Sequence, residues 1–284
     1  MSIHSVHPEK RILADTLIRI FLIGTALVML YPLIWNLYSS FKTNTEFLSD
    51  AFALPSGLAW DNYQRALVKS HLTENLLNSV FVVLVCLVSI LLLTVPAAYC
   101  LVRFRFPGAR VIMGIYMSAL FIQATYIMIP LFLQVNALGL LDRLLPLGVL
   151  YGVMQFPFSI FLLSGFIRGI PRDYEEAAMI DGCGFFSILR HIIYPMSRPG
   201  IVTVCMLSAM AAWNEYPVAL VMITDLNRQT LPVGLANLFE VQRYATDWGA
   251  LFAALILVLV PTIALFLAGQ KQLVRGIAMG GLKG

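Results

Sequence analysis

Apolar residues form six long, continuous runs along the chain, and shorter polar segments separate them. A helix needs about 20 mostly apolar residues to cross a hydrocarbon layer about 30 Å thick. The runs do not alternate between apolar and polar residues, as the strands of a β-barrel do. The pattern therefore predicts an all-α polytopic membrane protein, folded as one domain over residues 1–284, with six transmembrane helices at about 17–38, 76–98, 111–133, 144–166, 200–223 and 250–269.

Composition supports this class. The chain is 60% hydrophobic and 12% charged, whereas soluble domains carry about 25% charged residues. Most of the chain is therefore expected to contact membrane lipid or other buried helices. The net charge is only +4 and no long basic run is present, so no nucleic-acid partner is expected. The first apolar window exceeds the ~7–15 residues of a signal-peptide core, which predicts a retained first span.

Lysine and arginine residues predict the orientation, because the cytoplasmic loops of membrane proteins are enriched in them. The N-terminal segment, the loops 99–110 and 167–199, and the C-terminal tail together hold 13 of the 19 basic residues. The alternate segments hold the other 6. We therefore expect both termini and the loop 167–199 to face the cytoplasm, and the loops 39–75 and 224–249 to face outward.

Each predicted span contains a proline, which frees a backbone carbonyl and bends a helix. Bent helices suit a transport path, although proline is in any case frequent in membrane helices. Gly148 and Gly152 form a GxxxG pattern, which permits close packing of the fourth span against another helix. The six prolines are Pro32, Pro96, Pro130, Pro157, Pro217 and Pro261.

The sequence offers no catalytic chemistry. No lysine follows a glycine, so the Gly-Lys-Ser/Thr core of a nucleotide-binding P-loop is absent. The four histidines are scattered, without a metal-ligand cluster, and no GxSxG motif occurs. Asp181-Gly182 faintly resembles the site of intramembrane lipid-headgroup transferases, but Phe185-Phe186-Ser187 stands where those enzymes need other residues. We expect a chain that is not an enzyme, with no metal and no bound cofactor.

One carboxylate lies inside a predicted span: Glu215, in the stretch "AWNEYP" of the fifth span. Ionisable residues inside a membrane are costly and are by default functional candidates. Trp213, Asn214 and Tyr216 add aromatic and hydrogen-bonding groups, which suit a sugar. The alternative is that Glu215 caps a helix or packs against a neighbouring one. Gln123 and Asn78 are weaker candidates for the substrate pathway and are equally compatible with hydrogen bonds between helices.

The segment "PRDYEEAAMIDGCG" (171–184) differs from the apolar stretches on both sides of it, because it holds four carboxylates. Asp173 and Glu176 have the spacing of a helix N-cap and its capping-box partner, and Gly182 suits a position with positive φ after the helix. These signals predict a helix over 174–181, too short to span a membrane, followed by a second helical stretch from Phe185 to Ile193. Acidic residues disfavour binding to an anionic inner leaflet, so we expect a protein partner for the face formed by Tyr174, Ala177, Ala178 and Asp181, with Glu175 and Glu176 available for salt bridges.

With this segment the chain resembles the membrane-spanning permease subunits of binding-protein-dependent ABC importers. Their cytoplasmic pattern is E-A-A-x3-G-x9-I-x-L-P, and here only Tyr194 departs from it, where leucine is usual. The string "EEAAMIDG" is similar to the carbohydrate-uptake, MalG-like branch of this family. The same resemblance extends over nearly the whole chain, and it includes the stretches "SSFKTNTEFL", "AAYCLVRFRFPG" and "TLPVGL". The positions that match the pattern are Glu176, Ala177, Ala178, Gly182, Ile192 and Pro195.

The resemblance implies a fold of the type I importer permease kind, with a short coupling helix between spans 4 and 5, at Asp173–Gly182. That helix would dock on a separate ATPase, and Glu176 would pair with a basic residue there. Two ATPase copies, which carry ATP and Mg²⁺, a second MalF-like permease and an extracytoplasmic sugar-binding protein are the implied partners. The tail 270–284 would also touch the ATPase. The implied location is the cell (inner) membrane of a bacterium or archaeon.

Two alternatives remain open. An importer permease of the same kind could carry a solute other than a sugar. A secondary transporter would work without an ATPase, and it predicts inverted repeats and charged residues near the membrane midplane. Only Glu215 meets the second condition, and no internal repeat is evident.

Overall fold

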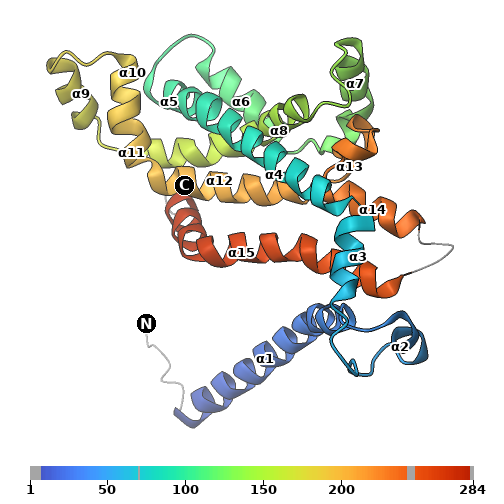
Figure 1. Ribbon diagram of the computed structural model, residues 1–284. Coiled ribbons are helices and arrows are strands. Elements are labelled where there is room, and N and C mark those ends of the chain that lie inside the picture. Colours follow the sequence, from blue (N-terminus) through green and yellow to red (C-terminus); the bar gives the residue numbers. More distant parts are fainter. Residues whose placement is uncertain (1–7, 70, 242–246, 282–284) are drawn as a thin grey trace. The chain divides into compact units, whose positions relative to one another are not determined.

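The computed structural model describes the backbone of residues 8–69, 71–241 and 247–281, and the side chains of 15–68, 71–239 and 247–270 (Figure 1). Every regular element in these ranges is a helix. The chain divides into two compact units, residues 1–67 with 241–257, and residues 68–240 with 258–284. The prediction of a single domain stays a prediction.

The first unit contains α1 (Pro8–Ser39), α2 (Asn44–Ser49), most of α3 (Asp61–Lys69) and the start of α15 (Trp248–Gly281). Thr43 caps α2 in a capping box with Glu46. Beside α2, the side chains of Trp35, Phe47 and Phe252 pack as an aromatic cluster, with ring centroids 5.0–6.1 Å apart. No residue of the most apolar stretch of α1 is buried within its own unit.

The second unit is built on α4 (Leu72–Ser89), which continues through a π-helical turn at Ile90–Thr94 into α5 (Val95–Arg103). This continuous helix packs along α8 (Leu144–Arg168) and α12 (Arg198–Trp213), and the three lie side by side in Figure 1. The predicted close approach at the GxxxG pattern is confirmed. A Cβ on Gly148 would lie 2.6 Å from the Cβ of Val85, and one on Gly152 would lie 2.7 Å from that of Ser89.

Proline lies within or beside several of these helices, and the predicted bend of each span at its proline stays a prediction. Pro32, Pro130, Pro157 and Pro261 lie inside helices. Pro96 follows the first π-helical turn, and Pro195 follows a second one at Leu189–Ile193. A proline removes one backbone donor and displaces the carbonyl four residues earlier. A local change from α- to π-helical hydrogen bonding is a common response to such a disturbance.

The prediction of six uninterrupted spans is correct only in part. Four helices are long and apolar enough to cross a membrane, at Asp15–Ser39, Leu72–Arg103, Leu144–Arg168 and Trp248–Gln270. The count among described residues reaches six only if two bent helix pairs each form one span. The chain is thus a multi-pass membrane protein with four to six spans.

The third predicted span, 111–133, is broken. It consists of α6 (Ala109–Ala119) and α7 (Ala124–Ala137), which meet at an angle of 107°. Gln123 has an extended backbone (ψ 144°) and precedes α7, so the helical hydrogen-bond ladder stops between the two. The apolar composition continues through this break, which explains why the sequence pattern gives no sign of it.

The fifth predicted span, 200–223, is also interrupted. Helix α12 ends at Trp213, and α13 (Pro217–Met222) starts after a three-residue break. Pro217 lacks a backbone donor and favours the first turn of a new helix. The helix pair that qualifies as a bent span is instead Phe185–Met196 with α12, at an angle of 76°. Beyond α13 come a 3₁₀ turn at Leu226–Arg228 and α14 (Leu231–Val241).

Candidate functional site

The acidic segment forms a short helix, α9 (Asp173–Ile180), one residue earlier than predicted. Its C-terminal end follows the prediction. Gly182 has φ +81°, the N–H of Gly182 donates to the carbonyl of Met179, and the N–H of Cys183 donates to that of Ala178. This pair of bonds is a Schellman motif with Gly182 at the left-handed position. The motif stops α9 after two turns and turns the chain toward α10.

The predicted N-cap is wrong. Asp173 is the first residue of α9, Arg172 occupies the N-cap position, and no side chain caps the helix. The carbonyl of Arg172 already accepts the backbone N–H of Glu176, which places the helix start one residue earlier. Asp173, Glu175 and Glu176 still lie in the first turn, where negative charge is favoured by the helix dipole.

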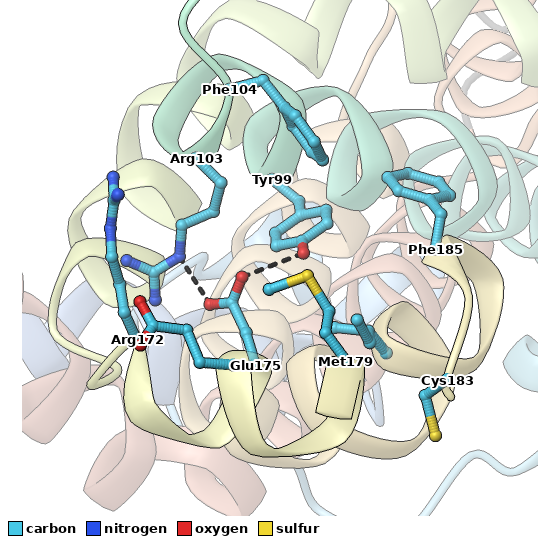
Figure 2. Close-up of a pocket in the computed structure, with 10 residues that line it drawn as sticks. Tyr99, Arg103, Phe104, Arg172, Glu175, Met179, Cys183 and Phe185 are labelled. Atoms are coloured by element: carbon cyan, nitrogen blue, oxygen red, sulfur yellow. Dashed lines mark hydrogen bonds and ion pairs between the residues drawn. The ribbon is translucent and has the colours of Figure 1, made fainter. Parts of the chain in front are cut away.

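Glu175 points into the protein. Its Oε1 lies 2.6 Å from Nε of Arg103 as an ion pair, and both side chains are 8% exposed. Its Oε2 accepts a hydrogen bond of 2.9 Å from the hydroxyl of Tyr99. The N–H of Arg103 is not aligned with Oε1, so that contact is one of charge rather than a directed hydrogen bond. Figure 2 shows Arg103 and Tyr99 converging on the Glu175 carboxylate from α5.

The remaining surface of α9 is largely exposed, including Glu176, which also borders a pocket lined by Tyr99, Arg103 and Glu175. Tyr174, Glu176, Ala177 and Asp181 are exposed, and Ala178 is half-buried. These residues include the predicted Tyr-Ala-Ala-Asp face, with Glu176 beside it. The two adjacent glutamates therefore have different environments: Glu175 is held by this chain, and Glu176 is accessible to another. Small alanine side chains on such a face allow a second surface to approach the backbone closely.

A pocket of about 290 Å³ lies between α9, the end of α5 and the start of α10 (Phe185–Ile188). Aromatic rings form one side of it: the centroid of Phe185 is 5.6 Å from that of Tyr99 and 6.0 Å from that of Phe104. The second helical stretch is confirmed, and it continues through the π turn to α11 (Tyr194–Met196). The hydroxyl of Tyr194, the one departure from the family pattern, donates to the carbonyl of Leu91.

Glu215 lies in the break between α12 and α13. Its carboxylate accepts the backbone N–H of Val218 (2.8 Å) and of Ala219 (3.1 Å). These two donors lie in the first turn of α13, where backbone N–H groups have no acceptor within the helix. The hydroxyl of the buried Tyr151, on α8, donates to the same carboxylate. This arrangement matches the alternative that Glu215 caps a helix and packs against a neighbour.

The other pathway candidates bind the protein's own backbone. The indole N–H of Trp213 donates to the carbonyl of Val258, and the amide of Asn214 donates to that of Met210 in its own helix. The amide of Asn78 donates to the carbonyls of Asn227 and Gln229. Tyr216 and Gln123 are exposed at the two helix breaks. A role of these five residues in a substrate pathway stays a prediction.

Sequence reasoning missed two polar clusters. Arg103 and Tyr99 lie in the family-like string "AAYCLVRFRFPG", but the sequence assigned neither of them a role beyond the positive charge of Arg103. Asp142 was not singled out either, although it has φ +56°, which is uncommon for a residue with a side chain. Its carboxylate accepts the backbone N–H of Thr224 (2.6 Å) and of Asp225 (2.9 Å). The backbone N–H of Asp225 is the main cause that lowers the pKa of Asp142, against the opposing effect of burial.

Among the described residues, no group of three or more histidine, cysteine or acidic side chains is arranged to hold a metal ion.

Residues 72–279 match the model of the family described as "binding-protein-dependent transport system inner membrane component". The chain belongs to this family. The resemblance inferred from the acidic segment is therefore confirmed, and the chain is a transport permease by family.

Relatives of this permease cover nearly its whole length. It is 34% identical over 259 residues to the diacetylchitobiose uptake system permease protein NgcG of Streptomyces coelicolor, covering 91% of this chain and 86% of that protein. It is 32% identical over 270 residues to the trehalose transport system permease protein SugB of Mycobacterium tuberculosis, covering 95% and 96%. A chain from the crystal structure of a bacterial ABC transporter that imports the acidic polysaccharide alginate superposes with a TM-score of 0.80 at 26% identity, covering 95% and 99%.

Proposed function

We propose that this permease is the membrane-spanning subunit of an ATP-driven importer for a disaccharide or oligosaccharide, with α9 as the helix through which a separate ATPase acts. The observation that carries the proposal is the division of roles on α9. One glutamate is used internally, while Glu176 and the alanine face are left exposed on a helix that spans nothing. Two named relatives take up disaccharides, which supports a sugar as the solute.

The energy for transport must then arrive from other chains, since this sequence has no P-loop lysine. Two ATPase subunits with ATP and Mg²⁺ close on each other, and Glu176 pairs with a basic residue of one of them. Closure displaces α9, and the attached helices switch the pathway from inward- to outward-facing. Hydrolysis resets the transporter. This chain itself contributes no catalytic residue, metal or cofactor.

The remaining partners follow from the same proposal. A second, MalF-like permease completes the pathway, and an extracytoplasmic binding protein delivers the sugar to the outer segment 224–249. Both termini and the loop 167–199 face the cytoplasm of the bacterial or archaeal cell. The tail 270–284 is a further contact for the ATPase. Side chains from 271 onward lie outside the described residues, as does the part 242–246 of the outer segment.

Reconstitution tests the proposal. The purified permease, its partner permease and the ATPase are placed in liposomes with the binding protein and given radiolabelled maltose, trehalose or diacetylchitobiose. We expect at least one of these sugars to accumulate, and only when ATP is present. Accumulation of none of them contradicts a disaccharide importer. An amino acid panel run in parallel identifies a non-sugar solute, which is the first alternative.

The same liposomes test the second alternative. An ion gradient replaces ATP, and the ATPase subunits are left out. We expect no accumulation of the sugar under these conditions. Gradient-driven uptake without the ATPase contradicts the proposal and identifies a secondary transporter.

A further inference from the structure

We propose that Glu175, Arg103 and Tyr99 are positioning residues that fasten α9 to the continuous helix Leu72–Arg103, so that displacement of α9 is carried along that helix to its far end. This inference rests on the proposed function of α9 as the site where the ATPase acts. It adds the residues that connect that site to the rest of the permease.

Glu175 and Arg103 form a buried junction between α9 and α5. The ion pair between Glu175 and Arg103 is buried, with each side chain 8% exposed. Arg103 also donates through Nη2 to the carbonyl of Ile170, at 2.6 Å, just before α9. Removal of one partner from a buried ion pair leaves the other charge uncompensated. Separation of α9 from α5 would therefore leave both charges without their partner in a buried environment.

Tyr99 adds a second contact between α5 and Glu175. Its hydroxyl holds the second oxygen of Glu175 at 2.9 Å, and its side chain is almost completely buried. Tyr99 and Arg103 are four residues apart on α5, so they lie on the same face of that helix. A hydroxyl donor and a positive charge from one helix face thus contact the two oxygens of one carboxylate (Figure 2). This geometry fixes the orientation of α9 as well as its distance from α5.

The helix Leu72–Arg103 connects this junction to the segment 227–231. The helix Leu72–Arg103 runs without a break for 32 residues, and the GxxxG contact seats it closely against α8. Near its other end the amide of Asn78 binds the carbonyls of Asn227 and Gln229, at 2.9 and 3.0 Å. The hydroxyl of Ser79 accepts the N–H of Leu231 at 2.7 Å. One helix is therefore fastened to α9 at one end and to segment 227–231 at the other.

The resulting assignment separates the two glutamates. Glu176 faces the ATPase, whereas Glu175 connects α9 to the span. Loss of Glu176 is expected to prevent the ATPase from engaging α9. Loss of the Glu175 junction is expected to leave the ATPase engaged but its motion poorly transmitted, so that ATP is hydrolysed without uptake.

The first test measures distances in the complete complex. Spin labels replace Arg105, just beyond α5, and Ile180, which is 86% exposed at the end of α9, in a background without the four native cysteines. We expect the distance between the labels to be the same in the nucleotide-free and ATP-bound complexes. With Glu175→Gln we expect the distance distribution to broaden or shift on addition of ATP. Glu176→Gln, the same change at the next residue, is the matched control for the nucleotide-free distance.

A change of this distance with ATP in the unsubstituted protein overturns the inference, because α9 then moves relative to the helix Leu72–Arg103. That outcome leaves the proposed function intact if ATP-dependent uptake persists. Failure of the ATPase to bind the permease at all contradicts the proposed function instead. The two failures are therefore distinguishable.

The second test measures transport per ATP hydrolysed, with the labelled panel sugar that the liposomes accumulate. For Glu175→Gln and for Tyr99→Phe we expect a fall of about fivefold or more, the lower end of couplings between linked sites, while the ATPase still co-purifies. A purely structural role would instead lower the folded yield and leave the ratio unchanged. Arg103→Gln combined with Glu175→Gln should lower this ratio by less than the product of the two single losses, because both variants remove the same ion pair. Losses that multiply overturn the assignment.

Discussion

At the scale of single residues, neighbouring side chains of the same type have different tasks. Glu175 and Glu176 differ by one position, yet one is buried against Arg103 and the other is exposed. The sequence could indicate that they face different sides, because consecutive residues on a helix lie about 100° apart. It could not reveal the partner of Glu175, which lies 72 positions away. Glu215 shows the same limit: the sequence marked it as unusual, and only the structure brings Tyr151 to it.

The environment of Glu215 predicts a structural role. Glu215→Ala should destabilise the permease by about 2 kcal/mol, because it uncaps α13 and leaves the Tyr151 hydroxyl without its acceptor. Thermal unfolding of the purified complex measures this. Asn214→Ala, at the adjacent exposed residue, is the control and should change stability much less. If Glu215→Ala instead leaves stability unchanged and raises the KM for the sugar, the carboxylate is a ligand rather than a cap.

The environment of Asp142 predicts a dependence on pH. Its pKa is lowered by the N–H of Asp225, so the ionised form is favoured in the folded state. The stabilisation is fully present above the unfolded-state pKa of about 3.9 and is lost as the pH falls through the lower folded-state value. Hydrogen exchange at the amides of Thr224 and Asp225 should therefore lose protection in acid. In Asp142→Asn the protection should be weak at every pH, and strong protection in that variant would contradict the assignment.

At the scale of elements, apolar length identifies helices but not their breaks. The windows at 17–38, 144–166 and 250–269 correspond to long helices, each of which continues past an internal proline. The window 111–133 is equally apolar but bends at Gln123. A hydropathy pattern does not contain the backbone conformation at Gln123, which ends the hydrogen-bond ladder there. The end of α9 was predictable, since Gly182 supplies a conformation that other residues rarely adopt.

The packing of α4 on α8 predicts which glycines are essential. Gly152→Val should destabilise the permease by about 1–3 kcal/mol, because its side chain would overlap Ser89 and force the helices apart. Gly114→Val, in α6, provides the control, since nothing lies within 4 Å of a Cβ there. Thermal unfolding of the two variants in the same detergent measures the difference. Equal stability of both would show that the close contact between α4 and α8 is unimportant.

At the scale of the whole molecule, the chain has the features of a transport pathway without those of a nucleotide-binding site. The sequence supplies spans, pathway candidates and an acidic helix, but no nucleotide-binding lysine. The chain belongs to the binding-protein-dependent permease family, and we propose that energy from other subunits enters it at the exposed face of α9. The identity of the sugar was not predictable, because the candidates at Trp213, Asn214 and Asn78 bind this chain's own backbone.

The most direct measurement is ATP-driven sugar uptake by the reconstituted complex with Glu176→Lys beside the unsubstituted protein. The exposed carboxylate becomes a cation, which reverses its interaction with a basic partner. We predict that the variant inserts into the membrane in normal amount, fails to retain the ATPase on purification and shows no ATP-dependent uptake. Glu74→Lys, an equally exposed glutamate in the first turn of α4, should retain uptake. Normal ATP-dependent uptake by Glu176→Lys would contradict the assignment of α9 as the site of energy transfer.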